Sequence, residues 1–206
     1  QLFDDELAAI VQAAHSMGRK VTAHAHGKDG IEAALNAGVD SIEHGTYLDD
    51  ATIALFKSTG ATLVPTVLAG MTVTGWVDEP WLPAASRSKA AEVGPRMLAM
   101  LSRAHKGGVR IAFGTDTGVS RHGENAREFA LMVEAGFTPE EAIRAATVIG
   151  SEHVEMSRDI GTLVPGKYAD IIAVTDNPLE DISALMRVDF VMKGGQIYKL
   201  DGQSGL

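Results

Sequence analysis

Short apolar segments rich in β-branched residues alternate with helical segments up to about residue 158. In the first helical segment, Asp4 to Met17, apolar residues recur at i, i+3, i+4 and i+7, and Gly18 follows it. Regular alternation of strands and helices is typical of parallel strands joined by crossover helices, so the sequence predicts an α/β fold. The expected strands are Val21–Ala25, Asp40–His44, Ala61–Val67 and Val109–Gly114.

The pattern changes after Arg158, where short β segments with glycine turns follow one another. Residues 1–158 are therefore predicted to form one unit, and residues 159–206 a β appendage that is too short to bury a core of its own. The expected β segments are Ile160–Leu163, Asp170–Val174, Phe190–Met192 and Ile197–Tyr198. Because a closed (β/α)₈ barrel typically needs about 250 residues, four β/α units form either a small open sheet or half of a barrel.

One stretch inside the larger unit, Ala69 to Ala84, is predicted to be irregular. It contains Trp76 and Trp81, and long loops in compact domains often act as lids or binding loops. The alternative is that the two tryptophans only anchor the loop.

Composition excludes several classes of function. The net charge of −9, without a basic run, argues against a nucleic-acid partner. No apolar run approaches the roughly 18 to 20 residues of a membrane span. The absence of cysteine excludes a thiol nucleophile and a cysteine zinc site. The sequence also lacks the glycine-rich motifs of dinucleotide and nucleotide binding.

Three residues with metal-ligand chemistry lie where expected parallel strands end. His24 and His44 end two strands, Asp116 follows a third, and glycine comes within three residues of each. Reactive groups of parallel α/β folds gather at these strand ends, and imidazole with carboxylate suits zinc and related divalent ions. The alternative is that each histidine is a hydrogen-bonded structural residue.

Three neighbouring residues are weighed beside this set. His26 lies two residues after His24. Three roles are open for it, namely a third metal ligand, a donor to a substrate carbonyl, or a loop residue without a functional role. His122 either contacts substrate or is solvated in the loop after Asp116. Glu43 is expected to point away from His44, as a structural partner.

Five motifs follow one another in an order that resembles a known family. They are Val21–Gly27, Ala37–Gly45, Phe113–Thr117, His122–Asn125 and Leu163–Asp170. Each motif alone is weak, but the ordered set covers nearly the whole chain. It resembles the amidohydrolase superfamily, in its Xaa-Pro dipeptidase-like or imidazolonepropionase-related branch.

The resemblance implies the C-terminal half of a (β/α)₈ TIM barrel, together with the C-terminal strands of a flanking β-sandwich. It further implies two divalent metal ions, commonly zinc, with His24 and His44 on one ion. Asp116 would bind the other ion and shuttle protons. The family's His-x-His and bridging lysine match no residue here, so an N-terminal half of the barrel is an expected partner. The isolated chain is then expected to be inactive.

The implied activity is hydrolysis of an amide or peptide C–N bond by a metal-activated hydroxide. The expected substrate is a dipeptide or N-acyl amino acid, with His26 or His122 donating to the oxyanion. A cyclic amidase or a deaminase of the same superfamily is an alternative, although Gly27 stands where deaminases carry glutamate. A non-catalytic fragment or interaction module is another. A homo-oligomer is compatible with the sequence, which predicts no compartment.

Overall fold

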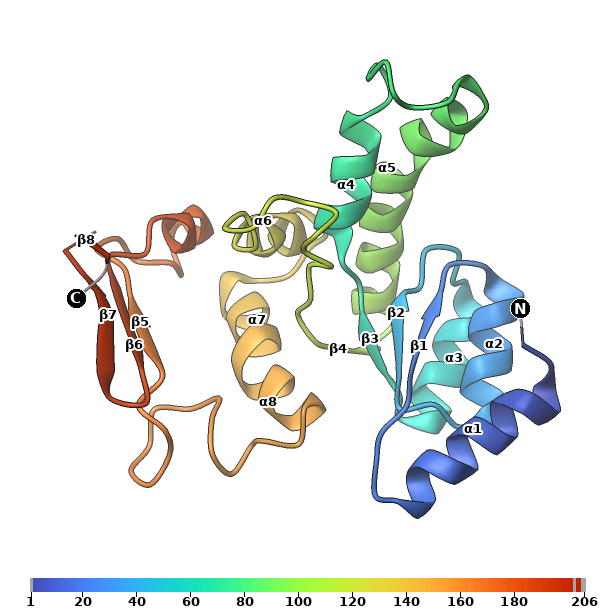
Figure 1. Cartoon of the computed structure of the whole chain (residues 1–206), viewed down its shortest axis with the longest axis horizontal. Helices are drawn as coiled ribbons and strands as arrows, with labels where there is room; N and C mark the ends of the chain where they lie inside the picture. The colour runs from blue at the N-terminus through green and yellow to red at the C-terminus, as the bar shows by residue number, and fades with distance from the viewer. Residues whose placement is uncertain (1, 202, 205–206) are drawn as a thin grey trace.

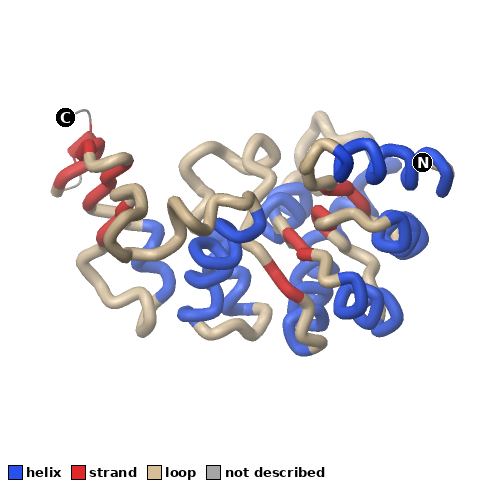
Figure 2. Tube along the Cα trace, turned by 90° about the horizontal axis from the view of Figure 1, so that it is seen from below, coloured by secondary structure: helices blue, strands red, loops and turns tan. Residues whose placement is uncertain are grey.

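The computed structural model describes residues 2–201 and 203–204, which form two four-stranded sheets (Figure 1). The N-terminal sheet is parallel, in the order β1-β2-β3-β4, and the α/β alternation predicted from the sequence is confirmed. Its strands are β1 (Thr22–Ala25), β2 (Ser41–His44), β3 (Thr62–Val64) and β4 (Arg110–Ile111). The helices before and between them are α1 (Asp4–Ser16), α2 (Lys28–Ala37), α3 (Asp50–Thr59), α4 (Val67–Gly75) and α5 (Ala84–Lys106). Figure 2 shows the strands side by side with helices packed along the sheet.

The two faces of the parallel sheet differ in chemistry. Ile42, Leu63 and Ile111 are aligned in register across the sheet and are buried in the helix-covered core. The alternate residues Thr22, Ser41, Thr62 and Arg110 form an aligned polar row on the other face. Because side chains alternate along a strand, the apolar row holds the helices and leaves the opposite face for polar groups.

The fourth strand is shorter than predicted. Only Arg110–Ile111 is a strand, although Ala112 still donates its N–H to Leu63. Phe113 instead donates to the carbonyl of Ala145, so the chain leaves the sheet before Gly114.

The prediction of an irregular stretch from Ala69 to Ala84 is wrong over its first half. Val67–Gly75 is the helix α4, and it packs against α5. Gly70 and Gly94 lie at this contact, where an added Cβ would come within 2.5 Å of Met97 Sδ and 2.8 Å of Thr74 Oγ1. Close packing thus stabilises a helix whose glycines and β-branched residues have low helix propensity.

The tip between these helices carries both tryptophans. Trp76 and Trp81 pack edge to face with ring centroids 5.1 Å apart, and Trp81 is exposed.

Beyond the sheet, the chain forms α6 (Arg127–Glu134), α7 (Pro139–Arg144), a π-helical turn (Ala145–Ile149) and α8 (Gly150–His153). A capping box starts α7, in which the side chains of Thr138 and Glu141 each accept a hydrogen bond from the other residue's backbone N–H. No helix in residues 2–201 and 203–204 is long and apolar enough to cross a membrane.

The C-terminal sheet is antiparallel, in the order β5-β6-β7-β8, with the bounds Ile171–Ala173, Phe190–Lys193, Gln196–Leu200 and Gln203–Ser204. A 3₁₀ helix, Ile182–Met186, buries Ile182 and Leu185 and contacts α6. The predicted strand Ile160–Leu163 is wrong. Gly161 has a φ of 91° and lies against Ser151, so the segment packs on α8 as turns.

Candidate metal site

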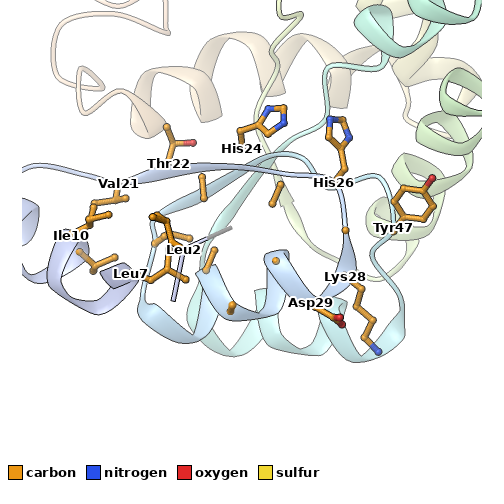
Figure 3. Close-up of a pocket in the computed structure, with 18 residues that line it drawn as sticks. Leu2, Leu7, Ile10, Val21, Thr22, His24, His26, Lys28, Asp29 and Tyr47 are labelled. Atoms are coloured by element: carbon orange, nitrogen blue, oxygen red, sulfur yellow. The ribbon is translucent and has the colours of Figure 1, made fainter. Parts of the chain in front are cut away.

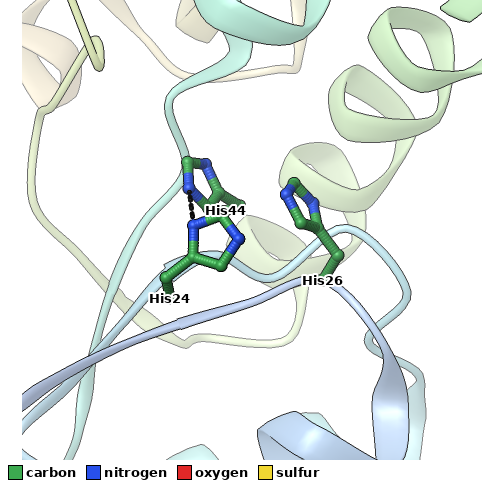
Figure 4. Close-up of side chains that lie close together, drawn as sticks. All are labelled: His24, His26 and His44. Carbon is green, nitrogen blue, oxygen red and sulfur yellow. Dashed lines mark hydrogen bonds between the residues drawn. The ribbon is translucent and has the colours of Figure 1, made fainter. Parts of the chain in front are cut away.

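Three histidines converge where β1 and β2 end (Figure 4). His24 and His44 belong to these strands, and His26 follows β1 directly. One ring nitrogen of each lies within 4.8 Å of the others. His44 Nε2 is 2.7 Å from His24 Nδ1, and the rings of His26 and His44 stack with centroids 4.6 Å apart. Such a group could bind a metal ion.

Left-handed backbone aims the side chains at this edge. His44, Thr66 and Asp116 have φ values of 72°, 49° and 50°, and each follows or ends a strand of the parallel sheet. Alternation along β2 would put His44 on the helix side with Ile42. Its positive φ returns the imidazole to the side of His24. Such values are uncommon outside glycine and mark sites where the surrounding structure imposes the conformation.

The same geometry corrects the prediction for Glu43. In register, Glu43 is aligned with His24, and its Oε1 accepts a hydrogen bond of 2.7 Å from Thr22 Oγ1. Glu43 is thus a structural partner, but it lies on the same face as His24, because the backbone of His44 departs from alternation.

Threonine hydroxyls hold two of the imidazoles. His44 Nδ1 is 2.6 Å from Thr66 Oγ1, and His26 Nδ1 is 2.8 Å from Thr46 Oγ1. Histidine ligands in metal sites commonly use one ring nitrogen for the metal and the other for such a partner. Each pairing engages Nδ1 and leaves Nε2 to face the cluster, where His44 Nε2 lies 2.7 Å from His24 Nδ1, so the donor set fits a divalent ion such as zinc.

Burial keeps two of the imidazoles uncharged at neutral pH. It lowers the pKa of His44 to about 4, with His26 and His24 adding to the effect. Burial and His24 likewise lower the pKa of His26. Neutral imidazole is the form that binds metal. The negative charge of Asp116 has a smaller effect on both pKa values, in the opposite direction.

Asp116 lies in a loop that side-chain hydrogen bonds hold in place. Asn125 Nδ2 donates to Thr115 Oγ1 at 3.1 Å and to Thr117 Oγ1 at 2.8 Å, so the residues on both sides of Asp116 are held. His122 is exposed in the same loop and is not part of the histidine cluster. The structure thus brings three of the five predicted site residues together, namely His24, His26 and His44, while Asp116 and His122 are not among the side chains whose ligand atoms lie within 4.8 Å of one another.

Sequence reasoning missed three residues that hold this set by hydrogen bonds, namely Thr46, Thr66 and Asn125. Thr66 follows a strand end, the same signal that identifies His44 and Asp116. The other two act through side-chain contacts that only the folded structure shows.

A cavity of about 900 Å³ lies along β1 between α1 and α2 (Figure 3). Leu7, Ile10 and Val21 line it, as do His24 and His26, whose rings project from the other side of β1 in this view. β1 is an outer strand of the sheet in the part of the chain that the structure describes, so the cavity follows an open sheet edge.

Known proteins resemble this chain over nearly its whole length. The model of the amidohydrolase family matches residues 1–198. Ochratoxinase from Aspergillus niger is 38% identical over 98% of the chain, which covers 42% of that enzyme. An uncharacterized protein of Mycobacterium tuberculosis is 32% identical over 95% of the chain and 52% of its own length.

Solved structures of similar proteins also match this chain over nearly its whole length. A crystal structure of a Xaa-Pro dipeptidase with bound methionine superposes with a TM-score of 0.93 at 43% identity, covering 97% of this chain and 49% of that one. A putative prolidase from Bifidobacterium longum gives a TM-score of 0.90 at 33% identity, covering 100% and 53%. The chain thus spans about half the length of these relatives, and its α/β fold corresponds to the C-terminal half of their barrel. On the family match and these identities, the chain belongs to the amidohydrolase family.

Proposed function

We propose that this chain carries part of the active site of a metal-dependent hydrolase that cleaves a peptide or amide C–N bond. The single observation that supports this most is the convergence of His24, His26 and His44 with ligand atoms within 4.8 Å, in a member of the amidohydrolase family. The resemblance to a Xaa-Pro dipeptidase favours a dipeptide or N-acyl amino acid with a free carboxylate as substrate.

His24 and His44 would hold one of two divalent ions, with zinc the best match to the donors, and Asp116 would contact the other. Bound ions would polarise the scissile carbonyl and lower the pKa of water to about 7. Asp116 takes a proton from the attacking water and passes it to the leaving amine nitrogen, which requires its carboxylate to face the cluster.

His26 is the better donor to the developing oxyanion. Its Nδ1 lies against the Thr46 hydroxyl, which can donate to it, so the neutral ring carries its proton on Nε2. His122 remains a proposed contact to the substrate, reached from the exposed loop after Asp116.

The open edge of β1 is the proposed contact with the N-terminal half of the barrel. An adjacent strand would pair with β1 and cover the apolar cavity lined by Leu7, Ile10 and Val21. In this arrangement residues 1–158 belong to the barrel, and residues 159–206 supply strands of a flanking β-sandwich. The chain alone would then be inactive.

The test compares the complete protein that contains this chain with its His44→Ala variant, by metal analysis and by hydrolysis of Xaa-Pro dipeptides and N-acyl amino acids. We expect about two metal ions and turnover in the former, and loss of metal and activity in the latter. The matched control is His105→Ala, because His105 stacks on Phe137 away from the cluster and should keep both properties. Full activity of the His44 variant, or of the isolated chain, contradicts the proposal.

A further inference from the structure

A buried carboxylate contacts the start of α4 from another helix. Glu128 of α6 is 0% exposed. Its Oε1 accepts from the backbone N–H of Val67 at 2.9 Å, and its Oε2 from that of Leu68 at 2.6 Å. These are the first two residues of α4, whose N–H groups have no partner within the helix. Glu128 therefore caps α4 from outside.

The residue that would ordinarily make this cap is Thr66. It occupies the N-cap position of α4, yet its side chain makes no capping hydrogen bond. N-cap threonine normally uses its hydroxyl to accept an N–H of its own helix. Here the Thr66 hydroxyl lies 2.6 Å from His44 Nδ1 instead.

The backbone of Thr66 is also unusual. Its φ of 49° is left-handed, which is a rare conformation for a β-branched residue. Such a conformation persists only where its surroundings hold it. The two hydrogen bonds that Val67 and Leu68 donate to Glu128 fix the residues that follow Thr66 immediately, and so fix the direction of the Thr66 side chain.

We propose that Glu128 is a positioning residue for His44. By capping α4 in place of Thr66, Glu128 leaves the Thr66 hydroxyl to bind Nδ1 of His44, which directs Nε2 of that imidazole into the histidine cluster. The inference rests on the proposed function, since it assigns Glu128 to the same metal site.

Two roles for Glu128 make different predictions. If Glu128 only started α4, its loss would lower stability and leave the imidazole where it is. If it also positions His44, its loss lets Thr66 turn its hydroxyl to the free N–H groups of α4. The partner of Nδ1 is then lost, and outer partners of this kind affect metal affinity about 10- to 100-fold.

The experiment uses the complete protein loaded with Co²⁺, whose visible spectrum reports the geometry of its ligands. Glu128→Leu should weaken Co²⁺ binding about tenfold or more and change the spectrum. Thr66→Val should give the same change, and the double variant should be no worse than Thr66→Val alone. Thr66→Ser keeps the hydroxyl and should restore the normal spectrum.

Met132→Ala is the matched control, because Met132 is fully buried on the same helix. It should lower the melting temperature without changing the spectrum or the Co²⁺ affinity. If Glu128→Leu does not fold, Glu128→Gln keeps the shape and must still lose one of the two acceptor contacts.

A normal spectrum and affinity in folded Glu128→Leu or Glu128→Gln overturns the inference and leaves the proposed function intact. Failure of the unchanged protein to bind Co²⁺ overturns the proposed function, and the inference with it.

Discussion

The two ends of the parallel sheet are built on different principles. At the carboxyl ends, three successive strand exits carry a left-handed residue that is not glycine, and the buried imidazole of His44 contacts the exposed imidazole of His24. At the amino ends, Lys20 Nζ caps α8 by donating to the carbonyls of Glu152 and His153, and Arg110 pairs with Glu152. These amino-end contacts are exposed and common on protein surfaces.

The difference shows where this fold accepts unfavourable local structure. A left-handed backbone at threonine or aspartate costs free energy relative to an ordinary turn. Burial of a histidine also costs free energy, because the imidazole can no longer be charged as it would be in water. They are collected at the end where a parallel α/β fold places its chemistry. We therefore expect substitutions at the carboxyl ends to change activity and metal binding, and those at the amino ends to change stability alone.

Asp116→Asn gives the sharpest test of the carboxyl ends. Asparagine keeps the shape and tolerates the left-handed φ of 50°, but it cannot accept a proton. We expect kcat of the complete protein to fall about a thousandfold, or about 4 kcal/mol in the barrier. The melting temperature should stay within a few degrees. Near-normal turnover would remove Asp116 from its proposed role.

The sequence predicts the parallel sheet well, because its strands and helices differ in period and glycine ends the helices. It fails where tertiary contacts override local preference. α4 forms because its glycines allow close contact with α5, and Ile160–Leu163 is drawn into turns by its packing on Ser151. Neither contact leaves a local signal in the sequence.

For the site, the strand-end rule predicted His24, His44 and Asp116, and the residue period suggested His26; of these, the structure brings the three histidines together. The rule could not find the groups that orient them. Thr66 and Glu128 act through one hydrogen bond to His44 and two to α4, which join residues up to 61 positions apart. The side of Glu43 was misjudged because a left-handed residue breaks strand alternation at His44.

Glu128 offers a test by pH. Burial raises its pKa to about 7, although the N–H groups of Leu68 and Val67 act against this. Between about pH 4.5 and 7 the folded state therefore binds more protons than the unfolded state at this group, so this contribution to stability falls as pH rises. As pH rises across that window, the free energy of unfolding of the complete protein should fall by on the order of 2–3 kcal/mol relative to that of its Glu128→Gln variant.

Chemical denaturation at several pH values measures the difference. No ion pair to Glu128 occurs within residues 2–201 and 203–204. Parallel curves for the two proteins would show that the carboxyl group is not buried as described.

Thr138→Ala removes an ordinary helix cap, and its effect can be compared with the loss of the cap that Glu128 makes. Thr138 caps its own helix, α7, through its own hydroxyl, far in the sequence from any residue of the histidine cluster. Its loss should cost about 1 kcal/mol of unfolding free energy, a shift of roughly 2–4 °C in melting temperature. Co²⁺ affinity should not change. If it falls as in Glu128→Leu, capping in general, and not the contact with Thr66, controls the site.

Arg110→Ala should have the smallest effect, because it tests the amino ends. Arg110 pairs with Glu152, and both side chains are 43% exposed. Exposed ion pairs contribute about 0–1 kcal/mol and weaken with salt, so the loss should be small and should vanish at high ionic strength. Turnover and metal content should match the unchanged protein. Arg110 lies on the polar face of the sheet, in one row with Thr22 and Thr62. A large loss of activity would mean that Arg110 affects the histidine cluster across this face. The functional difference between the two ends of the sheet would then be wrong.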